Sequence, residues 1–195
     1  MADKTPPAFE YALKHTLQFE GGYANDPADS GGETFRGVSR RNWPGWFGWK
    51  LIDQVKADGL RSASAINQRF ADDPQMAELV ADFYLCNFWR PFSGLSEMER
   101  LQVKLFDTAV NTGVGRAVKL LQQALNTLKS TPARLQVDGA LGPITMAVAR
   151  GLLEQDILCA FTSSQALFYQ GIVSRKPSQQ KFLKSWLRRA AWVPV

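Results

Sequence analysis

Two acidic residues, Glu20 and Asp29, have the types and the spacing of a pair that cleaves glycosidic bonds. Such cleavage uses one protonated carboxyl group, which gives its proton to the departing sugar oxygen, and a second carboxylate that acts on the sugar or on water. The two groups need environments that favour opposite protonation states. Spacing alone also fits an ordinary alternative, in which Glu20 is a solvated residue at a helix end and Asp29 forms a turn or cap.

The residues before Glu20 predict a helix that places this acid on its last turn. A proline pair at residues 6–7 suits a helix start, and apolar residues recur at helical spacing over residues 8–20. The glycine pair at residues 21–22 suits a left-handed helix end. The negative end of the helix dipole and partial burial beside aromatic neighbours both favour the neutral carboxyl group. We therefore expect Glu20 to be the proton donor.

Asp29 lies in a run of turn-forming residues, 25–32, and is expected to be ionised in a polar loop. Residues 33–39 then alternate weakly between polar and apolar types, which predicts a small β-hairpin beside the active-site cleft. Apolar residues at helical spacing predominate in the rest of the chain. The expected fold class is therefore mainly α, a helical bundle with this small hairpin.

Four short motifs resemble the glycoside hydrolase family 108 muramidases, which have an α+β lysozyme-like fold. The motifs are residues 19–23 (FEGGY), 25–29 (NDPAD), 31–39 (GGETFRGVS) and 107–113 (DTAVNTG). The resemblance places the conserved glutamate of the family at Glu20, and it aligns Asp29 and Thr34 with further motif positions. Asp26, in the same loop, is an alternative second acid. The series of Glu20, Asp29 and Thr34 is also similar to that of phage-type lysozymes, although the interval from Asp29 to Thr34 is one residue shorter.

This resemblance implies a substrate and a set of roles. The substrate is the β-1,4 bond between N-acetylmuramic acid and N-acetylglucosamine in peptidoglycan. Glu20 protonates the leaving oxygen, while Asp29 or Asp26 stabilises the developing positive charge, directs water or attacks the sugar. Thr34 positions water or substrate. A lytic transglycosylase, which needs a single Glu, and a non-catalytic wall-binding protein are the alternatives.

A second resemblance covers the C-terminal half of the chain. Residues 120–126 (LLQQALN) and 137–145 (VDGALGPIT) are similar to the predicted peptidoglycan-binding helical domain that usually follows the family 108 catalytic segment. The implied organisation is a catalytic region at residues 1–96 and a helical peptidoglycan-binding region at residues 97–195. No low-complexity linker separates them, so we expect the two regions to pack as one unit.

The composition narrows the range of partners and cofactors. The 23 Lys and Arg against 18 Asp and Glu give a net charge of +5, which suits an anionic partner such as a cell wall or an anionic membrane. The basic residues are scattered without a nucleic-acid-binding motif, so nucleic acid is not an expected partner. The single histidine, His15, excludes a multi-histidine zinc site. Cys86 and Cys159 lie in apolar helical patterns and are expected to be free core thiols. We therefore expect a monomer that acts on peptidoglycan without a metal or cofactor.

Four side chains are candidates for substrate binding: Tyr23, Asp26, Trp43 and Asn111. Trp43 begins an aromatic cluster, residues 43–49, whose rings either stack on sugars or anchor a loop in the core. Asn111 either hydrogen-bonds a substrate amide or ties down the turn after its helix. For both residues the structural alternative is the more common one in proteins.

Residues 182–190 place apolar side chains on one face and basic side chains on the remainder. This pattern fits either a helix on an anionic membrane surface or a terminal helix docked on the core with a basic outer face. The sequence has neither a signal-like N-terminus nor an apolar run of about 18 residues. The expected location is the host cytoplasm until release to the periplasm or cell wall, as a phage endolysin that lyses the cell or as an injected effector.

Overall fold

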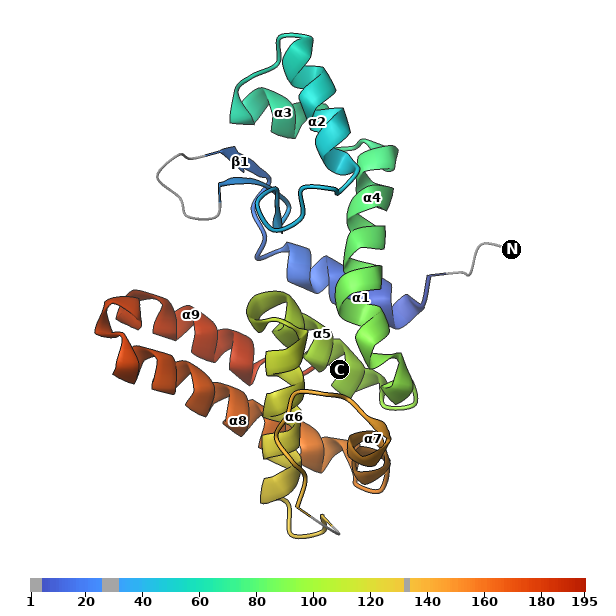
Figure 1. Ribbon diagram of the computed structural model, residues 1–195, viewed down its shortest axis with the longest axis vertical. Helices are drawn as coiled ribbons and strands as arrows, with labels where there is room; N and C mark the ends of the chain where they lie inside the picture. Colours follow the sequence, from blue (N-terminus) through green and yellow to red (C-terminus); the bar gives the residue numbers. More distant parts are fainter. Residues whose placement is uncertain (1–4, 26–31, 132–133) are drawn as a thin grey trace. The chain divides into compact units, whose positions relative to one another are not determined.

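The computed structural model describes residues 5–25, 32–131 and 134–195 (Figure 1). The chain divides into two compact units, Met1–Asn87 and Phe88–Val195. The boundary expected between residues 96 and 97 falls within the second unit, and as a boundary between functional regions it stays a prediction. The described part of the chain is mainly helical with a small antiparallel sheet, which confirms the expected α+β lysozyme-like class.

The first unit combines a short sheet with helices. Its described elements are α1 (Pro7–Leu17), β1 (Tyr23–Asn25), β2 (Glu33–Phe35), β3 (Val38–Ser39), α2 (Gly48–Ala57), α3 (Ala63–Arg69) and α4 (Pro74–Tyr84). The expected hairpin is confirmed as β2 and β3, and β1 adds a third strand with Tyr23 opposite Phe35. α4 begins where Asp73 accepts the N–H of Met76 at 2.9 Å, an N-cap followed by Pro74 at the first helical position.

Aromatic side chains fill the core of the first unit. Phe35 of the sheet stacks on Trp46 with 6.2 Å between ring centroids and meets Phe70 edge-on at 5.9 Å. Trp46 also packs edge-on against Trp49 at 5.2 Å, and Phe83 of α4 lies 6.3 Å from Trp46. These are the edge-on and offset geometries that aromatic rings favour. The cluster therefore ties the sheet to α2, α3 and α4.

All regular elements in the described part of the second unit are helices. Its elements are η1 (Leu85–Trp89, which starts before the division), η2 (Arg90–Leu95), α5 (Glu99–Thr112), α6 (Val114–Thr127), α7 (Pro143–Arg150), α8 (Glu154–Arg175), η3 (Pro177–Gln179) and α9 (Gln180–Ala191). Gly113 lies between α5 and α6 with φ of 87°. Glycine suits this position because a residue with a side chain would be strained in that conformation. α8 contacts α6 and α9, and α9 runs back along α8 (Figure 1). No helix in the described ranges is both long and apolar enough to span a bilayer.

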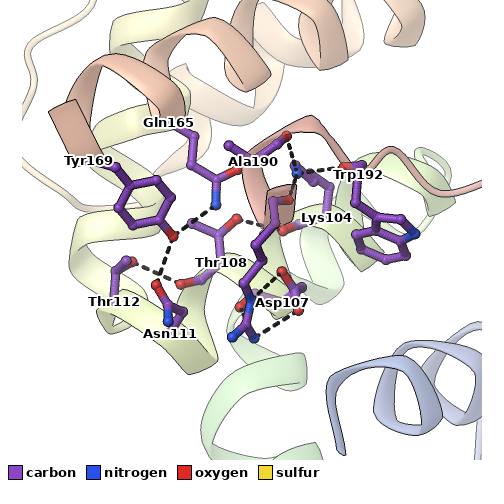
Figure 2. A network of polar contacts seen from close by, with 10 residues as sticks. Lys104, Asp107, Thr108, Asn111, Thr112, Gln165, Tyr169, Ala190 and Trp192 are labelled. Carbon is purple, nitrogen blue, oxygen red and sulfur yellow. Dashed lines mark hydrogen bonds and ion pairs between the residues drawn. The ribbon is translucent and has the colours of Figure 1, made fainter. Parts of the chain in front are cut away.

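A buried polar network fixes the end of α9 to α5 (Figure 2). Lys104 Nζ donates to the carbonyls of Arg189, Ala190 and Trp192 at 3.0, 2.8 and 2.6 Å. The Arg189 guanidinium donates from Nε and Nη2 to the two carboxylate oxygens of Asp107 at 2.9 and 2.8 Å. The C-terminal end of α9 is thus docked on the core, which agrees with one of the two interpretations of the sequence. Binding of its basic face to a membrane stays a prediction.

Burial lowers the pKa of Lys104 to about 8, with Asp107 acting against this shift and Arg189 adding to it. Below pH 8 the ammonium is charged in the folded and the unfolded chain, so the full cost of burying it is present. Between pH 8 and the ordinary pKa of 10.5 the unfolded chain binds the additional proton, so stability rises with pH. Relative to Lys104→Met, which does not titrate, the unfolding free energy of the wild type should rise by up to about 3 kcal/mol over this range. Urea unfolding of both proteins at pH 7 to 10.5 measures the difference, and a flat difference would contradict the assignment.

The two cysteines are free thiols, as expected, but both side chains are exposed rather than buried in the core. α8 buries Ile157, Leu158 and Phe161, and Cys159 falls on its outer face. Cys86 lies at the start of η1 and lines a surface groove. Both cysteines therefore lie in helical segments, as the apolar pattern predicts, but the prediction that their thiols are buried in the core is wrong.

Candidate active site

Glu20 lies just after α1 rather than within it. α1 ends at Leu17, and the N–H groups of Gln18, Phe19 and Glu20 donate to carbonyls three residues earlier at 3.2, 3.0 and 3.3 Å. These bonds form a tight final turn that already satisfies the carbonyls of residues 15–17. The expected helix over residues 8–20 therefore extends three residues beyond the observed end of α1, and fewer unpaired carbonyls remain to favour a neutral Glu20 carboxyl group.

The glycine pair after Glu20 has a different role from the expected left-handed cap. Neither Gly21 nor Gly22 has a positive φ. A Cβ at Gly22 would collide with Asn67 Oδ1, which accepts the backbone N–H of Tyr23 at 2.6 Å. Asn67 Nδ2 also donates to the Tyr23 carbonyl at 3.3 Å. Gly22 thus allows α3 to approach and fix the chain that leaves the Glu20 segment.

The turn between β2 and β3 packs directly against the Glu20 carboxyl group. Arg36 and Gly37 both have positive φ, 43° and 81°, the pattern that a two-residue type I′ hairpin turn requires. A Cβ at Gly37 would lie 2.7 Å from Glu20 Oε2 and closer still to Tyr84 Oη. Tyr84 Oη, from the end of α4, donates to the Arg36 carbonyl at 2.8 Å. Three segments far apart in sequence therefore meet at Glu20.

Glu20 lines a cavity of about 370 Å³ whose walls come from the end of α1 and from the hairpin turn. Two cationic residues, Lys14 and Arg36, share this cavity with Glu20. The remaining lining residues are Leu17, Gln18, Gly21 and Gly22. Glu20 is partly buried. A carboxyl group in this position can meet a ligand that enters the cavity, and the cations beside it suit a ligand with negative charge.

Glu33 is a second acid of the first unit, and its contacts assign it to the scaffold. Its carboxylate accepts the Tyr23 hydroxyl at 2.7 Å and forms ion pairs with Lys56 and with Arg40 Nε, the latter at 2.5 Å. Burial by itself would raise the pKa of Glu33, but the hydrogen bonds from Lys56 and Tyr23 and the charge of Arg40 together lower it. A carboxylate held in its charged form is a poor proton donor. The contacts of Glu33 therefore give it a role in the scaffold, which differs from the proton-donor role expected for Glu20.

The structure describes one of the three residues that are predicted to act with Glu20. Asp29 and Asp26 lie outside the described residues. Thr34 sits in the middle strand, paired with Ala24 and Ser39, on the sheet face opposite Glu33. The catalytic roles of Asp29, Asp26 and Thr34 stay predictions.

Comparisons with known proteins bear on both units. The sequence pattern of "Glycosyl hydrolase 108" matches residues 13–113, and that of "Predicted Peptidoglycan domain" matches residues 116–191. The first match contains Glu20 and covers more than half of the chain. The chain belongs to the glycosyl hydrolase 108 family. It is thus a glycoside hydrolase of peptidoglycan with a C-terminal peptidoglycan domain.

The fold of this family 108 protein is similar to a solved structure described as "Structure of Brucella abortus SagA". The TM-score is 0.62 at 24% sequence identity, and the match covers 94% of this chain and 90% of that chain. At this identity the likeness supports the fold alone. A comparison with curated proteins gives no match.

The substrate-binding candidates of the family 108 protein occupy different surroundings. Tyr23 is 5% exposed and its hydroxyl holds Glu33, so most of this side chain serves the scaffold. Trp43 is 38% exposed, meets Phe83 edge-on at 5.0 Å and lines a groove of about 440 Å³. Asn111 lies in the second unit, where its amide oxygen accepts the Tyr169 hydroxyl at 2.7 Å (Figure 2). Trp43 thus has a ring available to a ligand, whereas Asn111 ties α5 to α8. Substrate binding by each of them stays a prediction.

No group of three or more His, Cys, Asp or Glu side chains that would hold a metal occurs within residues 5–25, 32–131 and 134–195. The sequence does not indicate that Tyr84, Arg36 and Lys14 are neighbours of Glu20. Only the turn gave a signal, because a glycine in a two-residue link between strands is typical of a type I′ turn. The approach of Tyr84 depends on tertiary packing, since Tyr84 is 48 residues from Arg36.

Gly37→Ala should disturb the family 108 active site and destabilise the first unit by about 2 kcal/mol. The new methyl group meets Tyr84 and Glu20, and alanine is strained at φ of 81°. Peptidoglycan hydrolysis and urea unfolding of the variant measure the two effects. Gly45→Ala is the matched control, because Gly45 has open space around it and no positive φ. Equal stability and activity of the two variants would show that the turn does not position Glu20.

Proposed function

We propose that the protein hydrolyses the β-1,4 bond between N-acetylmuramic acid and N-acetylglucosamine, with Glu20 as the general acid. The observation that supports this most is the Glu20 carboxyl group in the wall of a cavity, held by the Arg36–Gly37 turn and the end of α4. The ion-paired Glu33 has no comparable access to a proton-transfer role. Lys14 and Arg36 supply positive charge where the anionic polymer of the wall would enter.

The second acid in this proposal is Asp29 or Asp26. Either residue stabilises the positive charge that develops on the sugar, directs water or attacks the sugar carbon, and Thr34 positions water or substrate. A separation of about 5 to 5.5 Å between the carboxyl groups leads to retention of configuration, and about 6.5 to 9.5 Å leads to inversion. The anomeric form of the first product, followed by NMR, distinguishes the two.

Analysis of the new sugar ends tests the proposed bond. Purified peptidoglycan is digested, the products are reduced with borohydride, and the reduced sugars are identified by mass spectrometry. The proposal expects reduced N-acetylmuramic acid. Reduced N-acetylglucosamine would assign the other glycosidic bond, and 1,6-anhydro ends would assign a lytic transglycosylase instead.

The biological role we propose is lysis of bacterial cells by an enzyme that stays in the host cytoplasm until release, in the manner of a phage endolysin. The supporting features are a wall-degrading family and a peptidoglycan domain in one chain. Expression in bacteria with and without a separate membrane-permeabilising protein tests this role. Culture density should fall only when both are present, and an injected effector would instead act when delivered to the periplasm of a neighbouring cell.

A further inference from the structure

The second unit contains a cavity of about 450 Å³ between α6 and α8, inside the region matched by the peptidoglycan domain. Two arginines, Arg116 from the start of α6 and Arg175 from the end of α8, contribute to its lining. Phe168 supplies an aromatic wall, and Gln123 and Ser164 add neutral hydrogen-bonding groups. This cavity, called the groove between α6 and α8 below, therefore combines two planar cations, an aromatic ring and neutral hydrogen-bonding groups.

The sequence around this groove contains no acid that would neutralise its arginines locally. No Asp or Glu occurs between Asp107 and Asp138, or anywhere after Asp156. α6 therefore carries no carboxylate, and α8 carries none beyond its first turn. A ligand with carboxylate groups would supply the missing charge.

Each of the two arginines packs against α8, which leaves the role of ligand binding to the N–H groups at the edge of its guanidinium plane. The Arg116 guanidinium lies 5.1 Å from the centre of the Phe168 ring, a cation–π arrangement. A Cβ at Gly171 would lie 3.3 Å from Arg175 Nη1, so the absence of a side chain there lets the Arg175 guanidinium lie close along α8. A glycine within a helix costs about 1 kcal/mol relative to alanine. The two guanidinium groups can thus offer the paired N–H donors that match a carboxylate.

The distribution of charge along the chain points the same way. Residues 88–195 contain 14 Lys and Arg against 6 Asp and Glu, whereas residues 1–87 contain 9 against 12. The net positive charge of the protein therefore belongs to the second unit and not to the unit with Glu20. Attraction to an anionic polymer is a property of that unit.

From these observations we propose that the groove between α6 and α8 binds carboxylate groups of peptidoglycan, through Arg116 and Arg175. The proposal rests on peptidoglycan being the substrate and deepens it. Peptidoglycan carries carboxylates on the peptides that branch from its glycan, whereas a neutral polymer of the same sugars does not. The groove thereby selects the peptide-bearing polymer and adds affinity away from the bond that is cut.

Binding to purified sacculi tests the groove in the full chain. Glu20→Gln is used as the background so that the polymer is not consumed, and affinity is measured by cosedimentation. We expect Arg116→Gln with Arg175→Gln to weaken binding by about tenfold or more, since two charge-assisted contacts are lost. The matched control is Lys129→Gln with Arg134→Gln, which removes the same charge from exposed positions outside the groove and should change affinity less than about twofold. Equal losses in both pairs would overturn the proposal in favour of unspecific attraction, and circular dichroism verifies folding.

Chemical change of the polymer identifies the group that is bound. Conversion of the carboxylates to amides should weaken binding of the background protein about tenfold and leave binding of the groove variant unchanged. Sacculi stripped of phosphate polymers should bind as before. Undiminished binding to amidated sacculi, or loss of binding on removal of phosphate, would overturn the proposal.

The outcome is separable from that of the proposed function. The groove variant in the wild-type background should give the same reducing ends as the wild type, at a lower rate on sacculi. If the new sugar ends from both the wild type and the groove variant assigned another bond, the proposed bond would be refuted and the groove result would remain intact. Unchanged binding with the expected ends would refute the groove alone.

Discussion

Glu20→Gln is expected to lower the rate of peptidoglycan clearing by about 100- to 10,000-fold, the usual contribution of a positioned general acid. Glutamine keeps the size and polarity of the side chain but has no proton to give to the leaving oxygen. The effect should fall on the maximal rate and leave binding to sacculi nearly intact, because the second unit carries its own peptidoglycan domain. Turbidity of purified sacculi measures the rate, and cosedimentation measures the binding.

Glu10→Gln is the matched control for this experiment. Glu10 lies in the first turn of α1, is exposed, and has the same type of side chain as Glu20. Its replacement should leave clearing unchanged. A folded Glu20→Gln protein that clears peptidoglycan at a nearly normal rate would remove Glu20 from the role of acid and leave the acid to be sought elsewhere in the family 108 region.

Arg189→Met is expected to lower the free energy of unfolding by about 3 to 5 kcal/mol, because it leaves the buried carboxylate of Asp107 without its guanidinium partner. Asp107 is 1% and Arg189 9% exposed, so water offers little compensation to either group. A loss of this size is a large part of the total stability of an ordinary domain. Urea unfolding followed by circular dichroism measures it.

Two further variants separate the ion pair from a general effect of α9. Arg188→Met alters the exposed neighbour and should change stability by less than about 0.5 kcal/mol. Asp107→Leu combined with Arg189→Met removes both charges and should recover part of the loss. A double variant less stable than Arg189→Met alone would show that the carboxylate stabilises the fold by other contacts.

This ion pair also explains part of the family signature. Asp107 and Asn111 belong to the motif at residues 107–113, which the sequence resemblance associates with the catalytic segment. In the structure, Asp107 binds Arg189 and Asn111 accepts the Tyr169 hydroxyl, so both attach α5 to the last helices of the chain. For these two residues the motif therefore includes contacts of the scaffold, and catalysis by Glu20 stays a prediction.

Features set by neighbours in sequence were predicted well. The hairpin over residues 33–39 follows from backbone preferences of a few consecutive residues. The end of α1 was wrong because the last turn tightened and satisfied its own carbonyls, an outcome that composition does not reveal. The exposed position of Cys159 was missed because an apolar pattern identifies a helix more reliably than the face of each residue.

The identity of the proposed acid comes from the sequence and stays a prediction, whereas the surroundings of that acid could not be predicted from the sequence. Glu20 was identified from its motif, but the turn at Gly37 and the hydroxyl of Tyr84 reach it only through the packing of the hairpin and α4. Contacts between residues so far apart in the sequence depend on the packing of the complete core, so local sequence patterns do not predict them.

The polar network of the second unit has a consequence for synthesis of the chain. Lys104 and Asp107 find their partners 82 to 88 residues later, at the last helix and the residue after it. Until those residues leave the ribosome, α5 carries a cation and an anion that no finished core can enclose. We therefore expect the second unit to complete its folding only after residues 189–192 have left the ribosome, so that a nascent chain or one cut short before them remains a substrate for chaperones and proteases.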